Sequence, residues 1–176
     1  MKALGQKSFA SFLCASLDVA RWVLIALLAI MILVGIPAYV IDAYVDLSWV
    51  TSPPPGVVLW PGMLIFIISL LVALVVVMRL RRIFATLTKG DPFVPENAVH
   101  LRVIWMTLAA YELMRMVVTS GAILTLNFLG NTATKTGLHG GLSINGGLWL
   151  AVAVLVVLAE VFREGARLRD EQKLTI

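Results

Sequence analysis

Apolar residues gather in four long runs along this chain, with polar segments between them. A helix needs about 20 predominantly apolar residues to cross the roughly 30 Å hydrocarbon core of a bilayer, and the runs lack the strict alternation of a transmembrane strand. The pattern predicts an all-α membrane protein, a single integral membrane domain over residues 1–176. Four transmembrane helices are expected in an antiparallel bundle, over about residues 22–45, 57–78, 103–126 and 144–162.

The polar segments that flank the runs also favour helix, so helices 2, 3 and 4 are expected to extend into the cytoplasm. Basic residues continue the second helix past Met78, Pro95 suits the first turn of the third, and Arg167 and Glu171 have the i, i+4 spacing of a helical ion pair. The pattern therefore predicts a cytoplasmic hairpin over 79–102 and a cytoplasmic tail over 163–176.

Prolines mark two exceptions to regular helix. Pro37 is expected to kink the first helix near its outer half. Ser52–Gly56 contains three consecutive prolines and is expected to form a stiff, non-helical connection.

Charge gives the orientation. The chain is 60% hydrophobic and 14% charged, with a formal net charge of +4. Lys and Arg favour the cytoplasmic side of a membrane protein, and here they cluster at the two ends and in the hairpin: Lys2, Lys7, Arg21, Arg79, Arg81, Arg82, Lys89, Arg102, Arg163, Arg167, Arg169 and Lys173. Both termini and the hairpin are therefore predicted to be cytoplasmic. This basic belt suits anionic headgroups of the lipid bilayer, and because it forms no separate basic face, we expect no direct nucleic-acid binding.

Two charged residues lie near the middle of the third apolar run. Glu112 and Arg115 are three residues apart, so they share a helical face and are expected to neutralise one another as an intramembrane ion pair. Thr119 extends the same face. The pair has two interpretations: an ion- or proton-linked switch, or an internal ion pair that fixes helix packing.

The residues for common enzyme chemistry are missing. The chain has one cysteine, Cys14, two histidines and no nucleotide-binding, zinc-binding or nucleophile-elbow motif. We therefore expect no enzymatic activity, no cofactor and no metal site. His100 is expected at the membrane interface. Glu160 is expected to be a solvated or interfacial carboxylate, with a pair to Arg163 or to a neighbouring helix as the alternative.

Two cytoplasmic stretches carry a family pattern. LTKGDPFVPENAVHLRVI, from Leu87, resembles the G-x-PF-x-x-EN-x-x-x-LR signature of the bacterial membrane family called domain of unknown function 2975, and LAEVFREGARLRDEQKLTI, from Leu158, resembles that family's C-terminal motif. The main matching positions form the predicted cytoplasmic motif: Gly90, Pro92, Phe93, Glu96, Asn97, Arg102, Glu160, Gly165 and Glu171.

The resemblance implies four spans in a bacterial inner membrane, no established enzymatic activity, and frequent gene neighbourhood with a small helix-turn-helix regulator. The polar residues of the two motifs are complementary, so we expect hairpin and tail to pack together as a cytoplasmic cap with Phe93 buried in the turn. The leading hypothesis is a regulator or scaffold whose cap engages a partner such as that regulator. The alternative is a small transporter or channel subunit that works as a homo-oligomer around Glu112 and Arg115.

Overall fold

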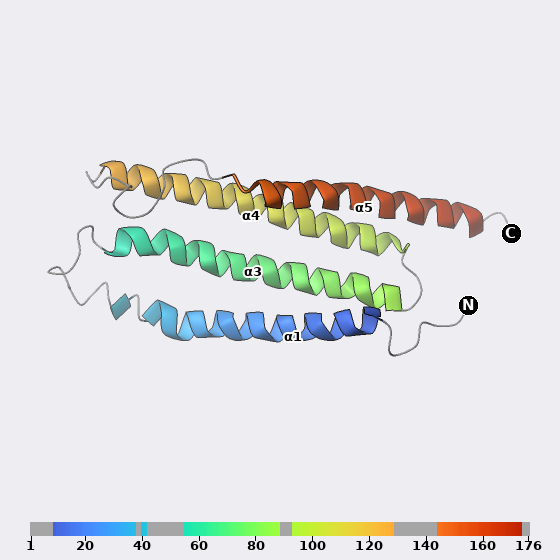
Figure 1. Ribbon diagram of the computed structural model, residues 1–176, viewed down its shortest axis with the longest axis horizontal. Coiled ribbons are helices and arrows are strands. Elements are labelled where there is room, and N and C mark those ends of the chain that lie inside the picture. Colours follow the sequence, from blue (N-terminus) through green and yellow to red (C-terminus); the bar gives the residue numbers. More distant parts are fainter. Residues whose placement is uncertain (1–8, 38–39, 42–54, 89–92, 129–143, 174–176) are drawn as a thin grey trace. The chain divides into compact units, whose positions relative to one another are not determined.

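All regular structure in the described part of the chain is helical. The computed structural model describes residues 9–37, 40–41, 55–88, 93–128 and 144–173 (Figure 1). The helices are α1 (Phe9–Ile30), which continues into the π-helical turn η1 (Met31–Gly35), α3 (Pro55–Thr88), α4 (Pro95–Phe128) and α5 (Gly146–Lys173). The predicted all-α class is confirmed for these residues.

Three of the described helices are long and apolar enough to cross a membrane. The qualifying stretches are Phe12–Gly35 in α1 and η1, Pro61–Thr88 in α3 and Gly146–Gln172 in α5. The helix α4, whose apolar run contains the charged residues Glu112 and Arg115, is not among them. The third transmembrane span therefore stays a prediction.

The helix ends match several expectations from the sequence. The helix α3 continues through Arg79, Arg81 and Arg82 as far as Thr88, and α5 reaches Lys173. The helix α4 begins at Pro95, whose missing N–H is harmless in a first turn, with Glu96 beside it.

One helix extends beyond its predicted span, and one boundary was predicted wrongly. The first helix begins at Phe9, before the predicted start of the membrane span at Trp22, because the residues between them are compatible with helix although they are less apolar. The stretch Ser52–Gly56 was expected to be non-helical throughout, but α3 begins at Pro55. The first turn of a helix needs no backbone N–H donors, so proline is tolerated there.

The first helix departs from α geometry directly before Pro37, at the turn η1. The Ile36 N–H donates to the carbonyl of Met31, five residues earlier. Pro37 has no N–H to continue the regular ladder, and π turns of this kind are a common source of helix irregularity. The irregularity lies where the sequence predicts a kink.

The described helices contribute to two compact units. The first comprises Met1–Ile25, Val72–Ala109 and Gly146–Ile176, and the second comprises Ala26–Leu71 and Ala110–Asn145.

The core of the first unit lies where α3, α4 and α5 meet. Ile83, Leu101 and Ile104 are buried at its centre. Partly buried apolar side chains surround them: Val76, Leu80, Leu87, Leu108, Leu155, Ala159 and Phe162. The α5 members recur at helical spacing, so one face of α5 packs on the hairpin helices.

Candidate functional site

A hydrogen-bond chain joins the end of α3 to the start of α4. Asn97 is fully buried, and its Nδ2 donates to Thr86 Oγ1 at 2.7 Å. The Thr86 hydroxyl in turn donates to the carbonyl of Ile83 at 2.7 Å, and the Asn97 N–H donates to the carbonyl of Val94 at 3.0 Å. A buried amide joined to a partner on another helix fixes the register between the two helices.

Phe93 connects this hairpin to α5. Its ring lies 5.8 Å from the ring of Phe162, centroid to centroid, at an interplanar angle of 42°. It also lies against Gly165, where a Cβ atom would be only 2.6 Å from Phe93 Cδ1. The close approach is possible because Gly165 has no side chain. The structure therefore brings together residues of both family motifs that are far apart in the sequence.

The expectation that Phe93 is buried in the turn is wrong. Its side chain is 43% exposed, because it packs against α5 and leaves the remainder of the ring uncovered. We call the cluster formed by Thr86, Phe93, Asn97, His100, Phe162 and Gly165 the hairpin site.

His100 lies beside Arg79 in the hairpin site. The distance from Arg79 Nη1 to His100 Nδ1 is 3.4 Å. Because a guanidinium can only donate, Nδ1 must accept, which requires a neutral imidazole with its proton on Nε2. Burial lowers the pKa of His100, as do the positive charges of Arg79 and Arg82, while Glu96 opposes them.

Acidification is therefore expected to destabilise the hairpin. The pKa of His100 in the folded protein lies below its ordinary value of 6.5, so the unfolded chain takes up a proton first as the pH falls. The contribution of His100 to stability is present above pH 6.5 and is lost as the pH falls through the folded pKa. Thermal melts in detergent between about pH 7.5 and about pH 5 should show a decline that is shallower in His100→Gln. Equal slopes in the two proteins would contradict this assignment.

Of the remaining residues of the predicted cytoplasmic motif, two lie on α4 and two lie on α5. Glu96 and Arg102 are exposed on α4. On α5, Glu160 pairs with Arg163, and Arg167 pairs with Glu164 at 2.8 Å and with Glu171 at 3.4 Å. These pairs lie along one helix and are exposed, so each adds little stability. Gly90 and Pro92 lie outside the described residues.

The predicted pair of Glu112 and Arg115 lies in the second unit. Arg115 donates from Nε to Glu112 Oε2 at 2.9 Å and from Nη2 to Oε1 at 2.6 Å. The Glu112 side chain is fully buried, whereas that of Arg115 is 20% exposed. A third donor, the backbone N–H of Asn145, reaches Glu112 Oε1 at 3.2 Å. Glu112 therefore holds both Arg115 and the residue that directly precedes α5.

Thr119, which was expected on the same helical face, bonds to the backbone of its own helix. Its hydroxyl donates to the carbonyl of Arg115 at 2.8 Å and lies 3.1 Å from that of Met116. A threonine that bonds back to its own helix satisfies its hydroxyl locally.

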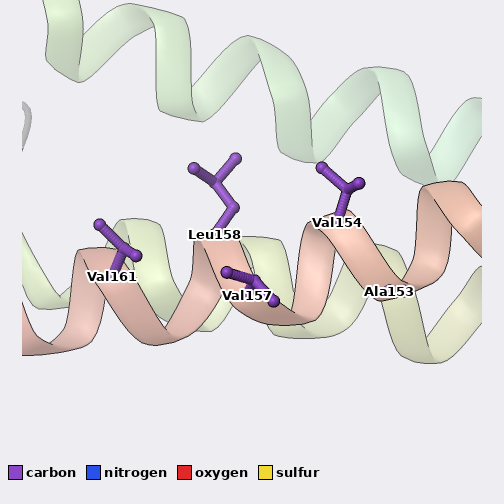
Figure 2. A pocket seen from close by; sticks show the side chains of 5 residues that line it. All are labelled: Ala153, Val154, Val157, Leu158 and Val161. Atoms are coloured by element: carbon purple, nitrogen blue, oxygen red, sulfur yellow. The ribbon is translucent and has the colours of Figure 1, made fainter.

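A shallow apolar groove runs along α5. It has a volume of about 370 Å³ and is lined by Ala153, Val154, Val157, Leu158 and Val161. Figure 2 shows Val154, Leu158 and Val161 on the same side of the helix. The residues that line the groove carry no charge and belong to a stretch that is long and apolar enough to cross a membrane.

The residues of the hairpin site and of the buried pair lie within a match to a known protein family. A model of the family described as "Protein of unknown function (DUF2975)" matches residues 46–176. The chain belongs to this family. The DUF2975 match includes both motifs identified in the sequence, which confirms the resemblance, and leaves α1 outside it. Comparison with curated proteins and with solved structures found no match.

Three contacts around these sites were not predicted. Thr86 bonds to Asn97, the Asn145 N–H bonds to Glu112, and Asp18 pairs with Arg81 at 2.7 Å. Only the last had a signal in the sequence, since Asp18 is a carboxylate on the helix that leads into the first apolar run. The other two involve a hydroxyl and a backbone amide, which are common and carry no pattern.

Proposed function

We propose that this DUF2975 protein is a non-enzymatic membrane regulator or scaffold whose hairpin site and α5 tail together bind a protein partner. In this proposal the chain crosses a bacterial inner membrane four times, with α4 as the third span. Both termini and the hairpin face the cytoplasm. The clustering of Lys and Arg at the ends and in the hairpin supports this orientation.

The contact of Phe93 with Phe162 and Gly165 is the observation that favours this function. It joins two motifs into one surface, although most of α4, the segment before α5 and the first part of α5 separate them in the sequence. Phe93 is half exposed there, and so is Leu168, which follows Gly165 by three residues on α5 among the ion pairs of Arg167. Exposed apolar residues within a charged rim are typical of protein interaction sites.

The partner proposed is a small helix-turn-helix transcription regulator, which the family resemblance suggests. A regulator held at the membrane would be kept from its DNA until the scaffold released it. The scaffold itself needs no enzymatic chemistry for this role.

The direct test is binding of the purified regulator encoded beside the gene to the full-length protein in mild detergent. Leu168→Ser should weaken binding by about tenfold, the loss expected when an apolar contact of about 1.4 kcal/mol is removed from an interface. Leu150→Ser is the matched control, since it makes the same change at an exposed position near the other end of α5. Unchanged binding by Leu168→Ser, or no binding by the wild type, would contradict the proposal.

A second candidate is a transporter or channel subunit, and the fully buried Glu112 in the predicted third span favours it. Because Glu112 already accepts three hydrogen bonds, from Arg115 and Asn145, we favour the packing role. Flux in proteoliposomes that Glu112→Gln abolishes would reverse this preference.

A further inference from the structure

An acidic side chain of α1 pairs with a basic side chain of α3 in the first unit. Arg81 Nε lies 2.7 Å from Asp18 Oδ1, close enough for an ion pair. The two groups are not aligned as a hydrogen bond, since Oδ1 is buried and accepts none. Both side chains remain partly exposed, Arg81 by 45% and Asp18 by 37%. The pair therefore leaves the terminal nitrogen atoms of Arg81 open to another anion.

Arg21 adds a second guanidinium to this surface. It follows Asp18 by three residues, so the two share a face of α1. Its Nε is buried and has no hydrogen-bond partner. Its guanidinium carbon lies 5.3 Å from the centroid of the Trp22 ring, which is itself 63% exposed. A charged group in apolar contact is stabilised by a counter-charge, and since Nε is enclosed, an anion that pairs with Arg21 would bind at its terminal nitrogen atoms.

The three charged side chains carry one net positive charge, two arginines against Asp18. Arginine binds phosphate with two parallel hydrogen bonds. Tryptophan favours the headgroup region of a bilayer, and a first span that begins at Trp22, as the sequence predicts, would place Arg21 and Trp22 at the depth of lipid phosphates. The net positive charge, the hydrogen-bonding geometry of arginine and the expected depth in the bilayer therefore all favour a lipid phosphate as the ligand.

We propose that Arg21 and Arg81 form a binding site for the phosphate of an anionic phospholipid, with Trp22 beside the headgroup. Asp18 holds Arg81 against α1 and offsets one of the two positive charges, which leaves one for the phosphate. The bound lipid would join α1, which lies outside the family match, to α3, which lies inside it.

The test is lipid binding to the full-length protein by native mass spectrometry, supported by thermal melts in detergent. Phosphatidylglycerol should bind at least about tenfold more tightly than phosphatidylcholine and should raise the melting temperature. Arg21→Gln and Arg81→Gln should each remove most of this preference. Arg21→Lys keeps the charge but cannot form two parallel hydrogen bonds with a phosphate, so this variant should retain part of the preference for phosphatidylglycerol.

Arg163→Gln is the matched control, because Arg163 is an exposed arginine paired with Glu160 on α5. It should bind phosphatidylglycerol as the wild type does. If Arg163→Gln loses the preference for phosphatidylglycerol to the same extent, the lipid is bound by a diffuse basic belt and the proposed site is wrong. Equal binding of the two lipids by the wild type would also overturn the site. Competition by soluble glycerol phosphate at the same concentration as the lipid would show a site for a free anion and would overturn the assignment to lipid.

Discussion

Glu112→Leu is expected to destabilise the protein by roughly 3 kcal/mol. The substitution leaves the Arg115 charge without its bidentate partner and removes the acceptor of the Asn145 N–H. Removing one partner of a buried ion pair costs about 3–5 kcal/mol, and the lower end applies because the Arg115 side chain is 20% exposed. Unfolding followed by tryptophan fluorescence in mixed micelles measures the difference.

The double variant Glu112→Leu with Arg115→Met separates the ion pair from the burial of either charge. Replacing both partners of a buried pair by apolar residues is often neutral or stabilising. The double variant should therefore recover most of the stability lost in Glu112→Leu. Leu113→Ala is the matched control, since Leu113 is a 55% exposed neighbour on α4. A double variant as unstable as the single one would mean that the Asn145 contact, rather than the ion pair, carries the effect.

Contacts within one helix were predictable from the sequence, as these residues illustrate. The spacing of Glu112 and Arg115 puts both on one face of a helix whatever the rest of the fold does, and the pairs of Arg163 and Arg167 on α5 follow the same rule. The helices themselves follow from apolar runs of membrane-crossing length. These inferences need only local geometry.

Contacts between helices were harder to predict. The Asn145 N–H is a backbone group 33 residues from Glu112, and every non-proline residue carries such a donor. Thr86 belongs to a run of ordinary polar residues at the end of α3, and nothing in its identity marks it as the partner of Asn97. The packing of hairpin against tail around Phe93 was predicted, but Phe93 is less buried than expected. Apolar character indicates that a side chain can be covered, but it does not indicate how fully.

Gly165→Ala is expected to destabilise the protein by about 1–3 kcal/mol, the usual cost of overpacking a close contact. The new Cβ would stand 2.6 Å from Cδ1 and 3.0 Å from Cε1 of Phe93, so the ring has to move away from α5. In an exposed helix the same substitution stabilises by about 1 kcal/mol. Gly121→Ala is the matched control, since nothing lies within 4 Å of its added Cβ. Thermal melts of the two variants should therefore shift in opposite directions.

Combining Gly165→Ala with Phe93→Ala tests whether the clash itself is the cause. Phe93→Ala alone should cost stability, because it removes the contact with Phe162. Once the ring is absent, the Cβ at position 165 meets no Phe93 atom, and only the gain in helix propensity remains. Gly165→Ala should then be neutral or stabilising in the Phe93→Ala background, a non-additivity of about 1–3 kcal/mol that marks direct contact. Strictly additive effects would mean that Phe93 and Gly165 do not touch in the folded protein, and the single surface that the proposed partner requires would be lost with that contact.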